Sequence, residues 1–172
     1  MNCCFEKEKA CCFIGHRKIK ITEELTLKLY QEIENLITKE GVLYFLFGSK
    51  SQFDTLCYKV VTKLKLKYKD IRRIYVRAEF PYIDSDYKAF LFERYEDTYY
   101  PEKIIHAGKA VYVERNLHML DVSKFCIMYY MDNYKPQAKL NNEFALEHKS
   151  KSGTKIAFEA ALRMGSIVIN VA

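Results

Sequence analysis

Several residue types and patterns are scarce or missing in this sequence, and each absence excludes a class of protein. The chain contains no tryptophan, three prolines and six glycines, which is too little proline and glycine for a collagen-like or disordered chain. No apolar run approaches the roughly 20 residues that a membrane-spanning helix needs. Residues 1–9 carry charges and no apolar core. We therefore expect no secretory signal, no membrane partner and a cytoplasmic location.

Motifs for metals, disulfides and the common phosphate loops are also missing. No Cys-x-x-Cys pair occurs, which argues against a zinc ribbon or a thioredoxin-like motif. Neither G-x-x-x-x-G-K-[ST] nor, after any predicted strand, G-x-G-x-x-G is present, so the chain has no Walker loop and no dinucleotide fingerprint. We expect no metal and no resident cofactor.

Two cysteines, Cys3 and Cys4, lie near the terminus. The other four lie in apolar stretches, where buried free thiols are expected; they are Cys11, Cys12, Cys57 and Cys126.

The composition that remains is that of one globular domain. The 172 residues are 49% hydrophobic and 29% charged, and a chain of about 150 residues buries roughly two-thirds of its unfolded surface. We expect a single domain over residues 1–172.

Lys and Arg total 28 and Asp and Glu total 22, so the formal charge is +6. A lysine cluster at residues 63–69, followed by Arg72 and Arg73, is interpreted as a solvated helix end. A patch for nucleic acid or another polyanion is the alternative.

Apolar runs and helical periodicities alternate along the chain. Strands are expected at residues 10–14, 42–47, 71–78, 103–106, 125–131 and 166–171. Helices are expected at residues 23–40, 53–64, 87–93, 109–120 and 154–164, and a long polar loop at 133–151. Apolar runs without polar alternation are typical of parallel strands that are covered on both faces. The sequence therefore predicts an α/β protein with a single Rossmann-like, open and mainly parallel sheet and helices on both faces.

Polar residues follow several predicted strands, at the edge of the sheet where ligands of such proteins bind. The candidate ligand-binding residues are Gly15, His16, Arg17, Gly48, Ser49, Lys50, Asp54, Arg115, Asn116, Ser152, Gly153 and Thr154. Glycine lets a backbone approach a ligand closely, whereas helix N-termini and arginine side chains favour anions. Asp54 is interpreted as an acceptor for sugar hydroxyls or as a turn cap. The set predicts a site for a phosphorylated or nucleotide-like small molecule.

Four segments carry a resemblance to a known family. They are CCFIGHRKI (residues 11–19), FGSKSQFDTL (47–56), YVERNLHMLDVSKFCIMYY (112–130) and KSGTKIAFEAA (151–161). In this order they resemble the SLOG superfamily, which is named for the DNA-processing protein Smf/DprA and the LOG phosphoribohydrolases, and within it the small bacterial proteins of the YpsA type. The resemblance implies a Rossmann-like fold and a nucleotide-derived ligand between the first, second and fourth segments, with Arg115 and Asn116 closing the site.

The chain departs from the enzymes of this superfamily at one position. LOG-type enzymes carry PGGxGTxxE, whose glutamate, three residues after the threonine, helps cleave an N-glycosidic bond. Here Ala157 stands three residues after Thr154, and Glu159 lies about 200° further around a helix. The resemblance thus favours binding over catalysis. If the protein is an enzyme, Asp54 or Glu114 is the candidate catalytic carboxylate.

We therefore expect a sensor or regulatory module that binds a nucleotide or a nucleotide-derived molecule and acts through a homo-oligomer or an effector protein. A LOG-like hydrolase of the N-glycosidic bond of a nucleotide is the alternative. A second alternative, less favoured, is DprA-like binding of single-stranded nucleic acid by the lysines and by tyrosines at residues 82–100. The chain holds 14 tyrosines, and the sequence assigns this surplus no other role.

Overall fold

The computed structural model describes residues 5–134 and 152–172. In this part of the chain, the strands of one sheet are β1 (Ala10–Gly15), β2 (Tyr44–Phe47), β3 (Arg72–Val76), β4 (Asp97–Tyr99), β5 (Phe125–Tyr129) and β6 (Ile167–Asn170). The α-helices are α1 (Glu23–Lys39), α2 (Gln52–Lys65), α3 (Ser85–Phe92), α4 (Val111–Asp121) and α5 (Gly153–Arg163). Short 3₁₀ turns lie at Lys7–Lys9, Glu102–Ile104 and Gly108–Ala110.

All neighbouring strands pair in parallel, in the order β4-β3-β2-β1-β5-β6. The predicted Rossmann-like α/β fold is confirmed, and the described sheet is entirely rather than mainly parallel. The chain runs outward from β1 through β2 and β3 to β4, and then returns through α4 to β5 on the other side of β1. The strand order therefore reverses between β1 and β5, and in open parallel sheets ligands bind at the carboxyl ends of strands at such a point.

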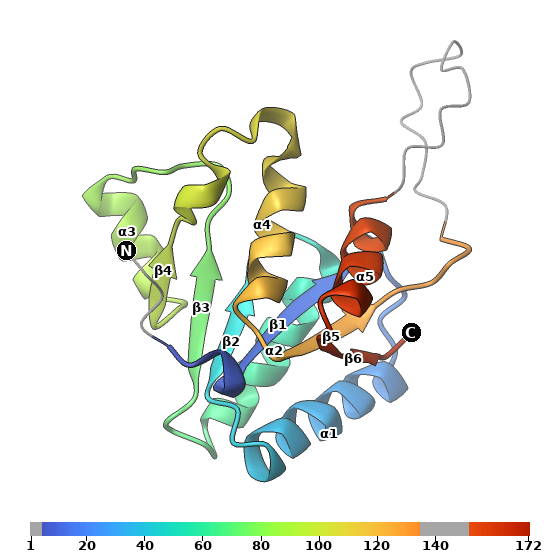
Figure 1. Ribbon diagram of the computed structural model, residues 1–172. Coiled ribbons are helices and arrows are strands. Elements are labelled where there is room, and N and C mark those ends of the chain that lie inside the picture. The colour runs from blue at the N-terminus through green and yellow to red at the C-terminus, as the bar shows by residue number, and fades with distance from the viewer. Residues whose placement is uncertain (1–4, 135–151) are drawn as a thin grey trace.

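Helices cover both faces of the sheet (Figure 1). α1 and α2 pack on one face, where the strand residues Phe13 and Phe45 meet Leu29 in a buried core. α4 and α5 pack on the other face, in a second core to which Cys12 and Leu46 belong. Neighbouring strand residues point to opposite faces, so the continuous apolar runs that the sequence shows supply both cores at once.

A capping residue and two glycines bound α1 and α5 where the sequence predicts. The Leu25 N–H donates to the Thr22 hydroxyl and starts α1. Gly41, just beyond α1, has a φ of 69°, and Gly165, just beyond α5, has a φ of 70°. Glycine adopts this left-handed conformation without the steric cost that other residues meet. Both glycines are therefore helix stops.

The prediction is wrong in one segment between β3 and α4. The strand expected at residues 103–106 is absent, because Glu102–Ile104 form a 3₁₀ turn, and the edge strand is Asp97–Tyr99. The Thr98 hydroxyl donates to the β3 backbone and reinforces this pairing. Pro101 has no N–H with which to extend a ladder. The residues that follow Pro101 therefore form a turn instead of a strand.

The cysteine prediction holds where the structure describes it. Cys11, Cys12, Cys57 and Cys126 are buried free thiols. Cys3, Cys4 and the predicted loop from residue 135 onward lie outside the described residues. Within the two described ranges, no helix is long and apolar enough to cross a membrane.

Candidate functional site

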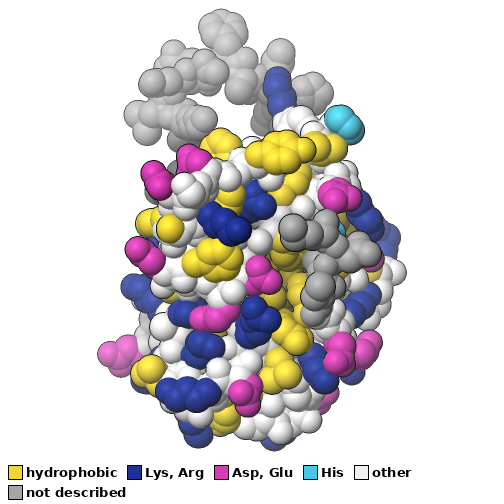
Figure 2. Space-filling view, turned by 90° about the vertical axis from the view of Figure 1, so that its left-hand side faces the viewer, with side chains coloured by type: hydrophobic (Ala, Val, Ile, Leu, Met, Phe, Trp, Pro, Cys, Tyr) yellow, Lys and Arg dark blue, Asp and Glu magenta, His cyan; other side chains and the backbone are white. Residues whose placement is uncertain are grey.

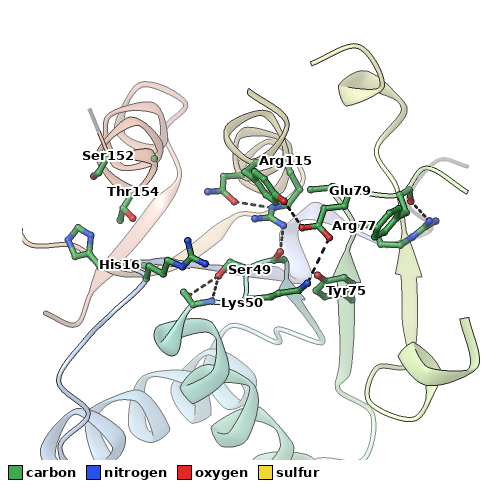
Figure 3. A pocket seen from close by; sticks show the side chains of 18 of the residues that line it. His16, Ser49, Lys50, Tyr75, Arg77, Glu79, Arg115, Ser152 and Thr154 are labelled. Carbon is green, nitrogen blue, oxygen red and sulfur yellow. Dashed lines mark hydrogen bonds and ion pairs between the residues drawn. The ribbon is translucent and has the colours of Figure 1, made fainter. Parts of the chain in front are cut away.

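A cavity of about 560 Å³ opens at the carboxyl ends of β1, β2 and β3, bordered by the first turns of α4 and α5 (Figure 3). Ligand pockets typically occupy roughly 300–1,000 Å³. The structure brings most of the predicted site residues to its wall: Gly15, His16, Arg17, Gly48, Ser49, Lys50, Arg115, Asn116, Ser152, Gly153 and Thr154. These residues are far apart in the sequence, and the parallel topology gathers them at one edge of the sheet.

His16 joins β1 to β5 at the point where the strand order reverses. The Met131 N–H donates to His16 Nε2 at 3.0 Å, whereas the Met131 carbonyl is 3.3 Å away. We assign Nε2 as the acceptor in the shorter of these two contacts, so the neutral ring bears its hydrogen on Nδ1. Burial lowers the pKa of the imidazole and favours this neutral form. Nδ1 is buried without a hydrogen-bond partner among the described atoms, so His16 contributes an unused N–H donor. Tyr134 stacks on the ring with centroids 3.7 Å apart.

The turn between β2 and α2 is held together by its own serines. The Asp54 N–H donates to the Ser51 hydroxyl at 3.0 Å, which makes Ser51 the N-cap of α2. The Ser49 hydroxyl donates to Ser51 Oγ at 2.8 Å. Both hydroxyls therefore shape the turn. Lys50, which is exposed, is the charged side chain that the turn places on the cavity wall.

Arg115 is almost wholly buried, with 2% of its surface exposed. Its Nη1 donates to the Gly48 carbonyl, and its Nε donates to Asn116 Oδ1 at 3.0 Å. A Cβ atom on Gly48 would lie 2.8 Å from the Cδ, Nε and Cζ atoms of Arg115. A Cβ atom on Gly15 would clash with the Phe53 ring. Packing therefore requires glycine at position 15 independently of any close approach by a ligand, whereas a Cβ atom on Gly48 would displace the Arg115 side chain.

Asp54 lies under the turn rather than on the cavity wall. It is 3% exposed, and its Oδ1 has no hydrogen-bond partner within the described part of the chain. Burial raises the pKa of this carboxyl to about 7, although the Arg115 charge and hydrogen bonds from the Gly48 and Ser49 backbone oppose the rise. Asp54 thus supports the turn from below, beside Arg115, instead of facing a sugar hydroxyl.

The start of α5 forms the wall near His16. The Lys155 N–H donates to the Ser152 hydroxyl at 3.2 Å, and Ser152 is the N-cap. The first-turn N–H groups and the positive end of the helix dipole lie there. A Cβ atom on Gly153 would meet nothing closer than a methyl carbon 4.0 Å away, so packing does not require this glycine. Ser152, Thr154 and His16 share one side of the cavity in Figure 3.

Sequence reasoning missed much of the remaining wall. The missed residues are Ser51, Tyr75, Arg77, Ala78, Glu79, Phe80, Tyr87, Tyr112 and Tyr134. Arg77 and Glu79 follow β3, which ends at Val76, whereas the predicted strand runs to residue 78. With the shorter strand, the rule that locates sites at strand ends would have found Arg77, whereas Glu79 directly follows the predicted strand as well. The tyrosines come from separate segments and carry no such signal.

The charges of the wall are unequal. Four basic side chains, Arg17, Lys50, Arg77 and Arg115, face one acidic side chain, Glu79, among the described residues of the wall. Arg77 Nη1 donates to the carbonyls of Phe80 and Pro81 at 2.6 and 3.1 Å and so holds the loop after β3.

Glu114 does not face this cavity. It lines a separate hollow of about 360 Å³ between α4 and α5, together with Lys103 and His118. Neither carboxylate that the sequence offers for catalysis therefore stands on the wall of the larger cavity, because Asp54 lies under the turn.

Fold and cavity together define a Rossmann-like α/β protein with a mainly basic pocket at the reversal of the strand order. No protein-family model and no curated protein matches the sequence. The case for a function therefore rests on the chemistry of the cavity.

Proposed function

We propose that this protein binds a nucleotide or a nucleotide-derived small molecule in the cavity, as a sensor or regulatory module. The observation that carries the proposal is the charge of the wall, where four basic side chains face one acidic side chain in the described structure. A recess lined by one sign of charge concentrates ligands of the opposite sign. His16 adds a neutral N–H donor, and α5 adds the positive end of its dipole. Phosphate is an anion that suits all three features.

Aromatic side chains provide the other half of a nucleotide site. Phe80, Tyr87, Tyr112 and Tyr134 lie on the wall. Phe80 is 53% and Tyr112 is 49% exposed, so both rings are open to a ligand, and aromatic faces stack on nucleic acid bases. The proposal includes a partner, either a second copy of the chain or an effector protein, whose activity changes when the ligand binds.

Both carboxylates that the sequence offers for N-glycosidic cleavage, the alternative function, lie off the cavity wall, and the carboxylate on the wall, Glu79, accepts a hydrogen bond from Tyr112. A general acid or base must come within hydrogen-bond reach of the reacting atom. Asp54 is buried under the turn, and Glu114 lines the other hollow. Ala157, which stands where LOG-type enzymes carry glutamate, is buried in the core between α5 and the sheet.

Binding of single-stranded nucleic acid also receives little support. The lysine cluster lies at the far end of α2, about 20 Å from its first turn. Lys67 pairs with Glu34 at 2.8 Å. Tyr82 is exposed, but Tyr95 packs against the core. On the side of the molecule that carries α3 and β4, Lys and Arg are interspersed with Asp and Glu (Figure 2).

A thermal-shift titration tests the proposal. Ribonucleoside mono-, di- and triphosphates are added to the protein, with the matching nucleosides and inorganic phosphate alone as controls. A ligand that binds only the folded state at about 100 times its Kd raises the Tm of a domain of this size by about 5–10 °C. We expect a concentration-dependent rise with at least one nucleotide and a smaller rise with its nucleoside. No rise with any nucleotide at millimolar concentration contradicts the proposal.

Arg17 offers a variant with a matched control. Its side chain is exposed at the cavity, so Arg17→Ala should change the free energy of unfolding by no more than about 0.5 kcal/mol. It should weaken the nucleotide-induced rise in Tm, because one phosphate donor is lost. Lys20→Ala removes an equal charge from the same exposed loop, outside the cavity wall, and should leave that rise unchanged. If both variants weakened the nucleotide-induced rise in Tm equally, the net charge of the protein, and not a contact with Arg17 on the cavity wall, would explain the effect.

A further inference from the structure

The cavity has two ends of different chemistry, which allows a finer statement about the nucleotide. Figure 3 shows Ser152, Thr154 and His16 at one end and Tyr75, Arg77 and Glu79 at the other, with Arg115 and Ser49 between them. The first end offers N–H and hydroxyl donors at a helix N-terminus. The second end offers aromatic rings and the Glu79 carboxylate, while Arg77 donates to the Phe80 and Pro81 carbonyls there and Lys50 lies beside Glu79.

The first end suits the phosphate. α5 is 11 residues long, and its N-cap Ser152 and first residues Gly153 and Thr154 lie on the wall. His16, which is 99% buried, brings the Nδ1–H donor that has no partner among the described atoms. A donor of this kind beside a helix N-terminus needs an acceptor, and a phosphate oxygen meets that need for both. The base of the same nucleotide then extends toward Glu79.

Glu79 is held in place but keeps free acceptor capacity. Its Oε1 accepts a hydrogen bond from Tyr112 Oη, which fixes the direction of the carboxylate. Its Oε2 lies 3.8 Å from Lys50 Nζ, so Lys50 offsets the charge at a distance longer than a hydrogen bond. An ionised carboxylate has about four lone-pair sites. At least two of them remain for a ligand beside the open ring of Tyr112.

We propose that Glu79 recognises the base by accepting hydrogen bonds from its amino-bearing edge, and that guanine is the preferred base. Guanine presents two adjacent donors, N1–H and the 2-amino group, which match the two oxygens of a carboxylate. Adenine and cytosine present an amino group next to an acceptor nitrogen. Uracil presents one N–H between two carbonyl oxygens, which repel a carboxylate. This inference rests on the proposed nucleotide binding and adds the identity of the base.

The decisive comparison uses GMP and IMP, which differ only in the 2-amino group. Kd values are measured by calorimetric titration for wild type, Glu79→Gln and Glu114→Gln. Wild type should bind GMP about 5- to 150-fold more tightly than IMP, the range for one well-placed base contact. Glu79→Gln should reduce this ratio to about 2 or less. Glu114→Gln loses a glutamate from α4 that lines the other hollow, and should keep the wild-type ratio.

The other outcomes separate this inference from the proposed function. Nucleotide binding by wild type without discrimination between GMP, IMP and UMP overturns the role of Glu79 and leaves the proposed function standing. An equal loss of affinity for all nucleotides in Glu79→Gln also overturns it, because Glu79 would then act on a part that they share. No binding of any nucleotide overturns both. Because Glu79 is exposed, the variant should fold, and its unfolding midpoint checks this.

Discussion

At the scale of the residue, Arg115 and Gly48 form one structural unit. The guanidinium of Arg115 donates to the Gly48 carbonyl, and a methyl group on Gly48 would clash with the same side chain. Arg115→Ala should destabilise the free protein by about 2–4 kcal/mol, because it removes charge-assisted hydrogen bonds from a buried site. Gly48→Ala should cost about 1–3 kcal/mol through overpacking. Denaturant unfolding of both single variants and of the double variant measures the coupling.

The double variant gives the sharper result. Without the Arg115 side chain the methyl group has room, so Gly48→Ala should cost at least 1 kcal/mol less in the Arg115→Ala background, within the range of about 0.5–3 kcal/mol for residues in contact. Gly15→Ala serves as the control, because its methyl group would meet Phe53 instead and its cost should be unchanged by Arg115→Ala. Additive costs for Gly48→Ala and Arg115→Ala would show that the two residues do not act together.

The strand-end rule locates residues well but does not give their roles. It places Gly15 and Gly48 at the cavity, yet the structure explains both glycines by the side chains that pack on them. It also selects Asp54, which lies in the first turn of α2 and is buried. Burial of a single side chain depends on tertiary packing, which a strand-end position does not encode. The same holds for Tyr75 and Tyr112, which line the cavity from distant segments.

At the scale of the element, the start of α5 is a part of the cavity wall where a substitution can test ligand binding without disturbing the fold. Gly153 is the first residue of the helix, its φ is not in the left-handed region, and a Cβ atom there has space. Gly153→Ala should therefore leave the free energy of unfolding unchanged or raise it by up to about 1 kcal/mol, because it restricts the unfolded chain. The same methyl group would stand where a phosphate approaches the first turn.

We therefore expect Gly153→Ala to reduce nucleotide-induced stabilisation while the unliganded Tm stays at or above that of wild type. Thermal shifts with and without nucleotide measure both effects in one experiment. Gly165→Ala is the contrasting variant, because Gly165 has a φ of 70° beyond the same helix and its replacement strains the backbone. A Gly153→Ala variant that is as responsive to nucleotide as wild type would place the ligand away from α5.

Elements with strong local signals are predicted well, and weakly patterned ones are not. α1 starts at Glu23 after its Thr22 cap and ends before Gly41, as the sequence indicates. β4 is three residues long, and two of them are tyrosine and aspartate at a sheet edge. So short a segment has no periodicity to read. Its pairing with β3 depends on tertiary contacts, so the strand predicted from the sequence begins a few residues after the observed β4.

At the scale of the whole molecule, the two basic regions lie at opposite ends of α2. The cavity end has an excess of basic over acidic side chains in the described wall, whereas the far end contains pairs such as Lys65 with Glu96, 3.8 Å apart, and Arg73 with Glu96, 2.7 Å apart. These pairs are partly buried, and they reduce the field that a polyanion would meet.

The buried carboxyl under the cavity makes the stability of the whole domain depend on pH. Burial raises the pKa of Asp54 from its ordinary 3.8 to about 7 in the folded state. Below about pH 4 the carboxyl is protonated in both states, and the folded state has its full advantage. Between pH 4 and 7 the unfolded chain ionises while the folded chain retains its proton, so stability falls as pH rises. The slope from this one group is at most about 1.4 kcal/mol per pH unit.

Asp54→Asn isolates this contribution, because an amide of the same shape does not ionise. Free energies of unfolding for wild type and variant at pH 4.5, 5.5, 6.5 and 7.5 should diverge, with the variant gaining relative to wild type as pH rises. The effect of His16, whose lowered pKa reduces stability as pH falls, is present in both proteins and cancels in the difference. Any constant cost of the amide beside Arg115 shifts one curve without changing its slope. Parallel curves would mean that Asp54 is ionised in the folded protein at pH 4.5, with Arg115 compensating its burial in full.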